Sequence, residues 1–187
     1  MSADYSGGQS HDSLSPASRL TRTALLTALV SVSRLSFSFL PNIQPMTVLL
    51  MSITLYYGWR VGLTVAWLSV VITNIYLGMG PWTFAQIGAY AGLIFLSSLL
   101  KKSHEQLSIP ALQVYVAFMG ILYGLLLSLL QAPFFGWNIF IPYYLSGLGY
   151  DLLHALGNML FFPLIYPLSL RLFKQTDTHR SEKRNDE

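Results

Sequence analysis

The chain has 187 residues, of which 53% are hydrophobic and only 10% are charged, and its formal net charge is +3. A soluble domain usually carries about 25% charged residues, so this composition excludes a globular fold with polar surface on all sides. The absence of cysteine excludes a disulfide framework, a thiolate metal site and a cysteine nucleophile. We therefore expect an all-α integral membrane protein.

Six apolar segments follow one another along the chain. A transmembrane helix needs roughly 20 apolar residues, and the second segment, with about 12, is short by that measure. Residues 1–18 are expected to form a flexible tail before a six-helix membrane domain of residues 19–174, and residues 175–187 a charged tail after it. The helices are expected over residues 20–39, 46–57, 61–77, 83–100, 111–130 and 146–172.

Six crossings would place both tails on the same side of the membrane. Ten of the eleven Lys and Arg residues lie in or beside those tails or in the loops on their side, and Arg34 is the exception. Because cytoplasmic segments carry an excess of Lys and Arg, both termini are predicted to be cytoplasmic. The connections near residues 41–45, 78–82 and 132–138 then face outward, and they contain no charged residue.

The first outer connection, FLPNIQPMTVLL at residues 39–50, places Asn42 and Gln44 between two prolines. Amide side chains offer both donors and acceptors, and irregular backbone at membrane depth survives only against protein or a water-filled cavity. The loop is therefore suited to lining a pocket for a polar, uncharged surface. A plain turn between two helices is the alternative, since Pro and Asn are common turn residues.

The other two outer connections add amide and aromatic side chains. The stretch NIYLGMGPWTFAQ contains Asn74, Trp82 and Gln86, and the third connection contributes Trp137, with Tyr144 close behind it. Trp and Tyr combine a flat apolar ring with a polar group, although an aromatic belt at the membrane interface is the alternative. Together the three connections predict a ligand mouth on the outer face.

The last helix carries a polar face in the stretch GLGYDLLHALGN, residues 147–158. Asp151, His154 and Asn158 lie on one side of this helix. A carboxylate facing lipid is costly, so this side should look into the bundle. Arg34 and Asp151 lie at similar depths, and we predict an ion pair between them, either as a structural link or as part of a ligand site.

The residue combinations of common enzymes and metal sites are missing. Asp151 and His154 supply two ligands, whereas a metal site needs a third or fourth, and the other histidines, at positions 11, 104 and 179, fall on the opposite side of the predicted membrane. No HExxH, GxSxG or P-loop occurs. We expect no catalysis, no metal and no intrinsic cofactor. A small intramembrane enzyme using Asp151 and His154 and a structural or assembly protein are the alternatives.

Several motifs together resemble a known family. Ala24-x-x-x-Ala28, RLSFSFLPNIQP, NIYLGMGPWTFAQ and DLLHALGN follow in that order within residues 20–172. This arrangement resembles the S components, the substrate-binding subunits, of energy-coupling-factor vitamin transporters, and the PNIQP and GxGPWT stretches are most similar to the cobalamin-type S components. The resemblance implies capture of cobalamin or a related corrinoid at the outer face of a bacterial cell membrane. Riboflavin, folate, thiamin or a smaller vitamin is the alternative.

The resemblance also implies partners. Ala24 and Ala28 would dock on a membrane coupling subunit that works with two cytosolic ATPases, so ATP would bind the partners and the vitamin would be the transported ligand. No nucleic acid is expected. The substrate-binding residues expected from the outer-face argument are Arg34, Asn42, Gln44, Asn74, Trp82, Gln86, Trp137, Tyr144, Asp151, His154 and Asn158.

Overall fold

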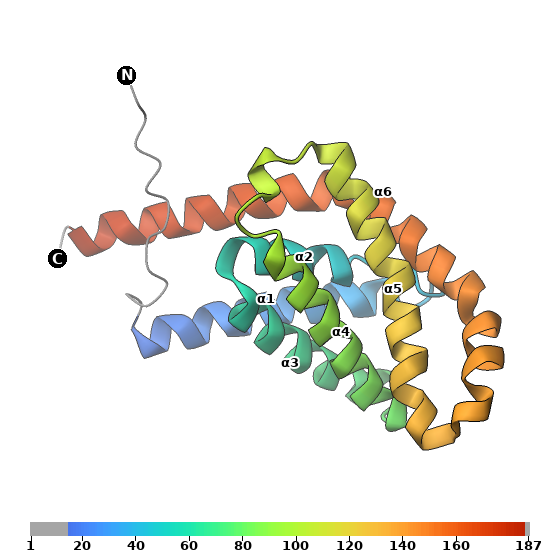
Figure 1. Ribbon diagram of the computed structural model, residues 1–187. Helices are drawn as coiled ribbons and strands as arrows, with labels where there is room; N and C mark the ends of the chain where they lie inside the picture. The colour runs from blue at the N-terminus through green and yellow to red at the C-terminus, as the bar shows by residue number, and fades with distance from the viewer. Residues whose placement is uncertain (1–14, 186–187) are drawn as a thin grey trace.

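The computed structural model describes residues 15–185, and side chains as far as residue 178. Every regular element in that part of the chain is helical, as the sequence predicts. Figure 1 shows the helices gathered in one bundle from which the C-terminal helix extends. They are α1 (Pro16–Ser36), α2 (Met46–Tyr57), α3 (Trp59–Leu77), α4 (Pro81–Leu99), α5 (Ile109–Phe135) and α6 (Phe140–Asn185), with the short 3-10 helices η2 (His104–Gln106) and η3 (Trp137–Ile139).

Local sequence signals explain most helix ends. The Ser15 hydroxyl accepts a hydrogen bond from the backbone N–H of Ser18 at the start of α1, and Pro16 occupies the first turn, where its missing N–H costs nothing. At the other ends, α2 stops at Gly58 and α3 at Gly78, both with positive φ (96° and 105°). Glycine adopts this conformation without the steric penalty that a side chain brings.

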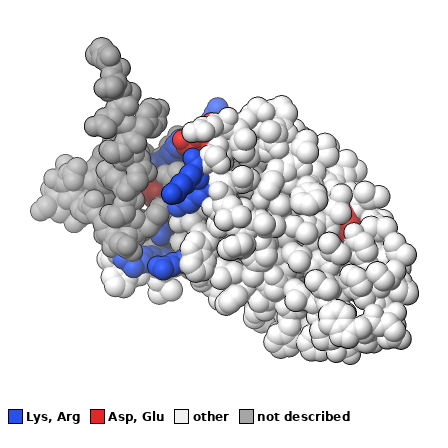
Figure 2. All heavy atoms as spheres, in the orientation of Figure 1, with Lys and Arg blue, Asp and Glu red and all other residues white. Residues whose placement is uncertain are grey.

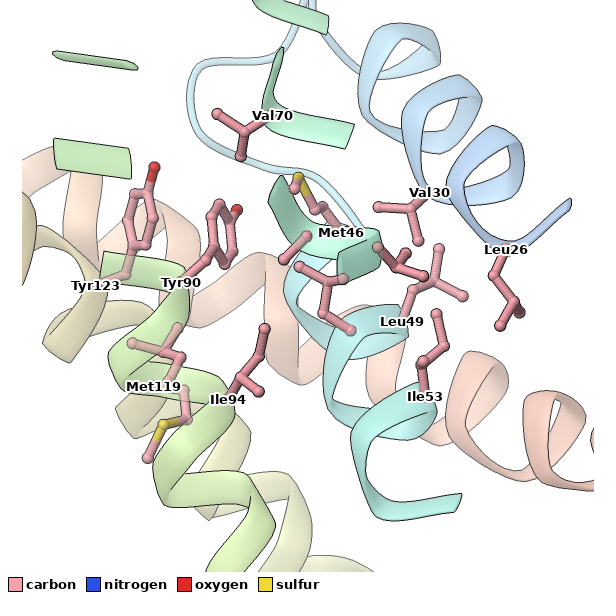
Figure 3. Close-up of a cluster of buried hydrophobic side chains, with 14 of the residues drawn as sticks. Leu26, Val30, Met46, Leu49, Ile53, Val70, Tyr90, Ile94, Met119 and Tyr123 are labelled. Atoms are coloured by element: carbon pink, nitrogen blue, oxygen red, sulfur yellow. The ribbon is translucent and has the colours of Figure 1, made fainter. Parts of the chain in front are cut away.

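Helix α2 forms the centre of the bundle. All of its residues except Tyr56 are buried, and it packs against each of the other five α-helices. Figure 3 shows how its Met46, Leu49 and Ile53 meet side chains from α1, α3, α4 and α5. The central position explains why this helix is apolar all round, because no side of it faces water or lipid.

Four described helical segments are long and apolar enough to cross a membrane: α3, α4, α5, and the stretch from η3 into α6 (Trp137–Thr178). Large apolar side chains on them are exposed, for example Phe84 (70%) and Leu164 (69%). An exposed apolar surface of this kind is suited to lipid contact. These features indicate a multi-pass membrane protein. α2 is too short to be counted among these membrane-spanning segments, and α1 contains three arginines.

Several predicted boundaries were wrong, among them the end of α1, at Ser36 rather than residue 39, and the start of α6, at Phe140 rather than residue 146. α1 begins at Pro16, inside the predicted tail of residues 1–18, whose residues 1–14 lie outside the described part of the chain. α5 continues through Pro133 to Phe135, because a proline one turn from a helix end removes few hydrogen bonds. α6 continues to Asn185, since the predicted charged tail from residue 175 contains no Gly or Pro that would end a helix. Residues 186 and 187 lie outside the described part.

Gly120 on α5 lies close to the backbone of α6. A Cβ added to Gly120 would lie 2.6 Å from the backbone nitrogen of Ala155 on α6, and backbone cannot move aside as a side chain can. We expect Gly120→Ala to destabilise the fold by about 1–3 kcal/mol, the usual cost of overpacking. Thermal unfolding of the purified protein in detergent measures this. Gly149→Ala is the matched control, because nothing lies within 4 Å of its added Cβ; equal unfolding temperatures for the two variants would contradict the prediction.

Candidate functional site

A cavity of about 420 Å³ lies between α1, the loop that follows α1, and helices α4, α5 and α6. Its volume falls within the range of about 300–1,000 Å³ that is usual for small-molecule sites. Five of the predicted site residues line it: Arg34, Asn42, Gln44, Gln86 and Asp151. The sequence therefore identified the amide and charged part of its wall.

Arg34 enters the cavity from the last turn of α1. Its side chain is only 7% exposed, and Nη1 donates a hydrogen bond of 2.6 Å to Thr73 Oγ1 on α3. The Thr73 hydroxyl in turn donates to the carbonyl of Ser69 (2.7 Å). One edge of the guanidinium is thus held by α3, while Arg34 retains further donors because a guanidinium has five N–H groups.

The loop between α1 and α2 forms a second wall. Asn42 has a φ of 59°, in the left-handed region that asparagine tolerates better than most residues. Its Nδ2 donates a hydrogen bond of 2.8 Å to the carbonyl of Tyr150, which ties the loop to α6. The loop also lies close to Gly157, whose added Cβ would meet the Cα of Ile43 at 3.3 Å. Asn42 therefore positions the loop as well as lining the cavity.

Gln86 on α4 is oriented by a residue of the preceding helix. Asn74, only 1% exposed, donates from Nδ2 to Gln86 Oε1 (2.8 Å) and to Thr83 Oγ1 (3.0 Å). Because the Gln86 carbonyl oxygen already accepts this bond, its NH₂ group is left to donate, and the Tyr123 hydroxyl is one partner within its reach. An NH₂ group has two N–H donors, so one remains for a bound molecule. Asn74 itself does not line the cavity. Its contribution in the structure is to hold Gln86.

Asp151 reaches the cavity from α6, where it is 6% exposed. Its carboxylate lies against Gly124 of α5, so closely that a Cβ on Gly124 would fall 1.9–2.1 Å from the carboxylate atoms. Only a residue without a side chain leaves room for this carboxylate. Gly124 therefore contributes to the site by leaving room for the Asp151 carboxylate.

The predicted ion pair between Arg34 and Asp151 does not form. Both residues line the cavity, but neither makes an ion pair within 4.0 Å with any residue in the described part of the chain. Arg34 is hydrogen-bonded to Thr73 on α3, and Asp151 packs against α5. Helix α4 packs against both α3 and α5. Equal depth along two helices places the two charges at the same height in the bundle, but it does not determine the distance between them across the bundle.

His154 and Asn158 connect helices away from the cavity. His154 Nε2 shares a hydrogen bond of 2.8 Å with Thr47 Oγ1 on α2, and Asn158 Nδ2 donates to the Val116 carbonyl on α5 (3.0 Å). Both side chains are completely buried. The prediction that this side of the helix looks into the bundle is confirmed. Contact of these two residues with a ligand stays a prediction, and neither lines the cavity.

The predicted aromatic residues lie outside the cavity. Trp82 is 41% exposed and donates from Nε1 to the Gly78 carbonyl (3.3 Å), and Trp137 is 65% exposed in η3. Tyr144 stacks on Phe140 with ring centroids 6.3 Å apart. Exposed Trp side chains near helix ends fit the interfacial-belt alternative. A ligand contact by any of the three stays a prediction.

Helix α5 and the start of α6 contribute lining residues that the sequence did not identify. They include Tyr123 and Ser128 on α5 and Tyr143, Ser146 and Tyr150 on α6. A signal was present in α5, where Gly120, Gly124 and Ser128 recur at four-residue spacing on one side of the helix. Gly-x-x-x-Gly spacing is typical of close helix packing, and Gly124 in addition lines the cavity.

A second, largely apolar hollow of about 500 Å³ runs along α1 and α3. The predicted docking residues Ala24 and Ala28 line it and are exposed, whereas their neighbours Thr27 and Ser31 are buried in the bundle. Leu68, Ile72 and Tyr76 of α3 form the other wall. The small side chains of α1 thus leave a shallow groove on the surface.

In residues 15–178, no group of three or more His, Asp or Glu side chains is placed to hold a metal ion. Comparison of the chain with protein-family models, with curated proteins and with solved structures gives no match.

Proposed function

We propose that the chain is the substrate-binding membrane subunit of an importer of the energy-coupling-factor type. The cavity that contains Arg34 and Asp151 is the observation that carries the proposal. Charged side chains inside a membrane domain are costly and usually functional. In this chain, two of them are placed in the same small-molecule-sized space together with three amide side chains.

The proposed topology has six crossings, with both termini in the cytoplasm of a bacterium. The N-terminal end of α1 and the C-terminal end of α6 lie at the same end of the molecule in Figure 1, as an even number of crossings requires. Figure 2 shows Lys and Arg gathered at that end, while the remaining visible face is almost free of charge. Both features support a cytoplasmic position for that end, and the cavity would then open toward the outer face.

The proposed substrate is a vitamin. The cavity volume of about 420 Å³ is in the lower half of the usual range for small-molecule sites. A corrinoid is far larger than a typical drug-sized ligand, so most of its surface would stay outside. The volume therefore favours a vitamin smaller than cobalamin.

In this proposal the chain binds the solute and other subunits supply energy. The groove at Ala24 and Ala28 would dock on a membrane coupling subunit, because small residues let helices approach closely. Two cytosolic ATPases would complete the importer. An enzyme using Asp151 and His154 is less well supported, since His154 is hydrogen-bonded to Thr47 and does not line the cavity.

The proposal is tested by blocking the cavity. Thermal-shift measurements and native mass spectrometry of the purified chain with thiamin, riboflavin, folate and cobalamin should identify a bound vitamin. Ser146→Trp should abolish that binding, because Ser146 is an exposed residue of the cavity wall. The matched control is Leu145→Trp, whose side chain is 57% exposed and does not line the cavity. The proposal is wrong if no vitamin binds the wild type, or if Ser146→Trp binds as the wild type does.

A further inference from the structure

We propose that the cavity selects dipolar ligands, in which an anionic group contacts Arg34 and a cationic or N–H-donating group at another position contacts Asp151. The inference rests on the proposed function, namely that this cavity binds a small solute. It adds the chemical class of that solute.

The first step concerns Arg34. Its guanidinium is almost fully buried, and the hydroxyl of Thr73 is the partner that the described residues provide. No carboxylate of residues 15–178 lies within 4.0 Å of the guanidinium. A buried charge without a counter-charge is unfavourable, and the planar guanidinium fork matches a carboxylate or phosphate group. The position is therefore suited to an anionic group that the ligand brings.

The second step concerns Asp151. Its carboxylate makes no hydrogen bond and no ion pair within the described part of the chain, although the side chain is 94% buried, as its 6% exposure implies. A carboxylate accepts hydrogen bonds and donates none. What it lacks is an ammonium, a protonated ring nitrogen or an N–H group. Gly124 leaves the space that the carboxylate occupies against α5.

The third step is that the two charges are held apart. If they met, they would neutralise each other and the cavity would suit a neutral ligand. Instead Arg34 is anchored on α3 through Thr73, and Asp151 lies in the notch at Gly124 of α5. A dipolar ligand satisfies both charges at once, whereas a neutral ligand satisfies neither and a singly charged ligand only one.

The other lining residues of the cavity include polar but uncharged side chains. Asn42, Gln44 and Gln86 contribute amide groups, and Tyr123 lines the same space. These groups suit a ring with its own donors and acceptors. The ligand class is thus a ring-containing molecule with an acidic group at one end and a basic or N–H group at the other.

The test uses sets of molecules that share a ring and differ in charge. Tryptophan, tryptamine and indole-3-propionate form one set, and thiamin monophosphate and thiamin form another. Isothermal titration of the wild type is expected to favour the dipolar member by about tenfold or more over its singly charged relatives, since hydrogen bonds to charged groups are strong. Arg34→Gln should remove the preference over the cationic relative, and Asp151→Asn the preference over the anionic one.

The control variants remove one positive and one negative charge outside the cavity. Arg22→Gln lies on α1 and Asp177→Asn on α6, and neither residue lines the cavity; both variants should keep the wild-type preference. Gel filtration checks folding, and Arg34→Lys, which keeps the charge but not the fork, replaces Arg34→Gln if that variant does not fold. The inference would be overturned if singly charged or neutral molecules bound as tightly as dipolar ones, or if Arg34→Gln and Asp151→Asn both kept the wild-type preference. Either result would leave the proposed function standing. If no molecule of these sets or of the vitamin panel binds the wild type, the inference and the proposed function both fail.

Discussion

If the chain is the importer subunit proposed above, a double variant with Ala24→Trp and Ala28→Trp should lose vitamin uptake by the assembled importer, while the purified chain still binds the vitamin. Both alanines are exposed in the groove between α1 and α3, so two indole rings fit the isolated chain but fill the groove. Overpacking costs about 1–3 kcal/mol per site in a close contact, and 1.4 kcal/mol is a tenfold change in association. Two insertions should therefore weaken docking by more than about tenfold.

Uptake of radiolabelled vitamin by cells or proteoliposomes that contain all subunits measures the effect, and titration of the purified chain measures binding. Leu29→Trp is the matched control. Leu29 is 48% exposed on the same helix but does not line the groove, and at 100° per residue it points about 100° away from Ala28 and about 140° away from Ala24. Wild-type uptake by the double variant would exclude a docking role for this groove.

Gly124→Ala should weaken ligand binding to the isolated chain by about tenfold or more, because it displaces a charged hydrogen-bonding group. The added methyl group would occupy the position of the Asp151 carboxylate, which must then turn away from its place in the cavity. Titration with the identified vitamin measures the loss. Unlike removal of the charge, this change leaves Asp151 in the sequence, so it tests the position of the carboxylate.

Gly92→Ala provides the comparison for Gly124→Ala. It lies on α4, outside the cavity wall, and its added Cβ would meet the end of the Leu126 side chain at 2.9 Å, which can rotate away. We expect this variant to bind ligand as the wild type does. Unchanged affinity of Gly124→Ala, with both variants folded, would show that the carboxylate position is irrelevant to binding.

The helix positions were predictable where glycine and proline mark the ends. The predicted second helix, residues 46–57, coincides with α2, and the next two differ from α3 and α4 by at most two residues at either end. Gly58, Gly78 and Pro81 supply these signals locally. The last two helices differ from the prediction because Pro133 lies inside α5 rather than in a loop, and because α6 continues past the charged residues that follow residue 172. Charge ends an apolar span without ending a helix.

The sequence alone determined the all-helical membrane class and the polar residues on which a site could be built. Arg34, Asn42, Gln44, Gln86 and Asp151 were identifiable because polar groups are rare in such a chain and need a partner. Only the tertiary structure decided how these residues are used. It separates Arg34 from Asp151 and assigns His154 and Asn158 to contacts between helices. Helical periodicity determines the depth of a side chain and the direction in which it points. Which residues surround that side chain depends on how closely the helices pack. In this protein, residues such as Gly124 decide that spacing.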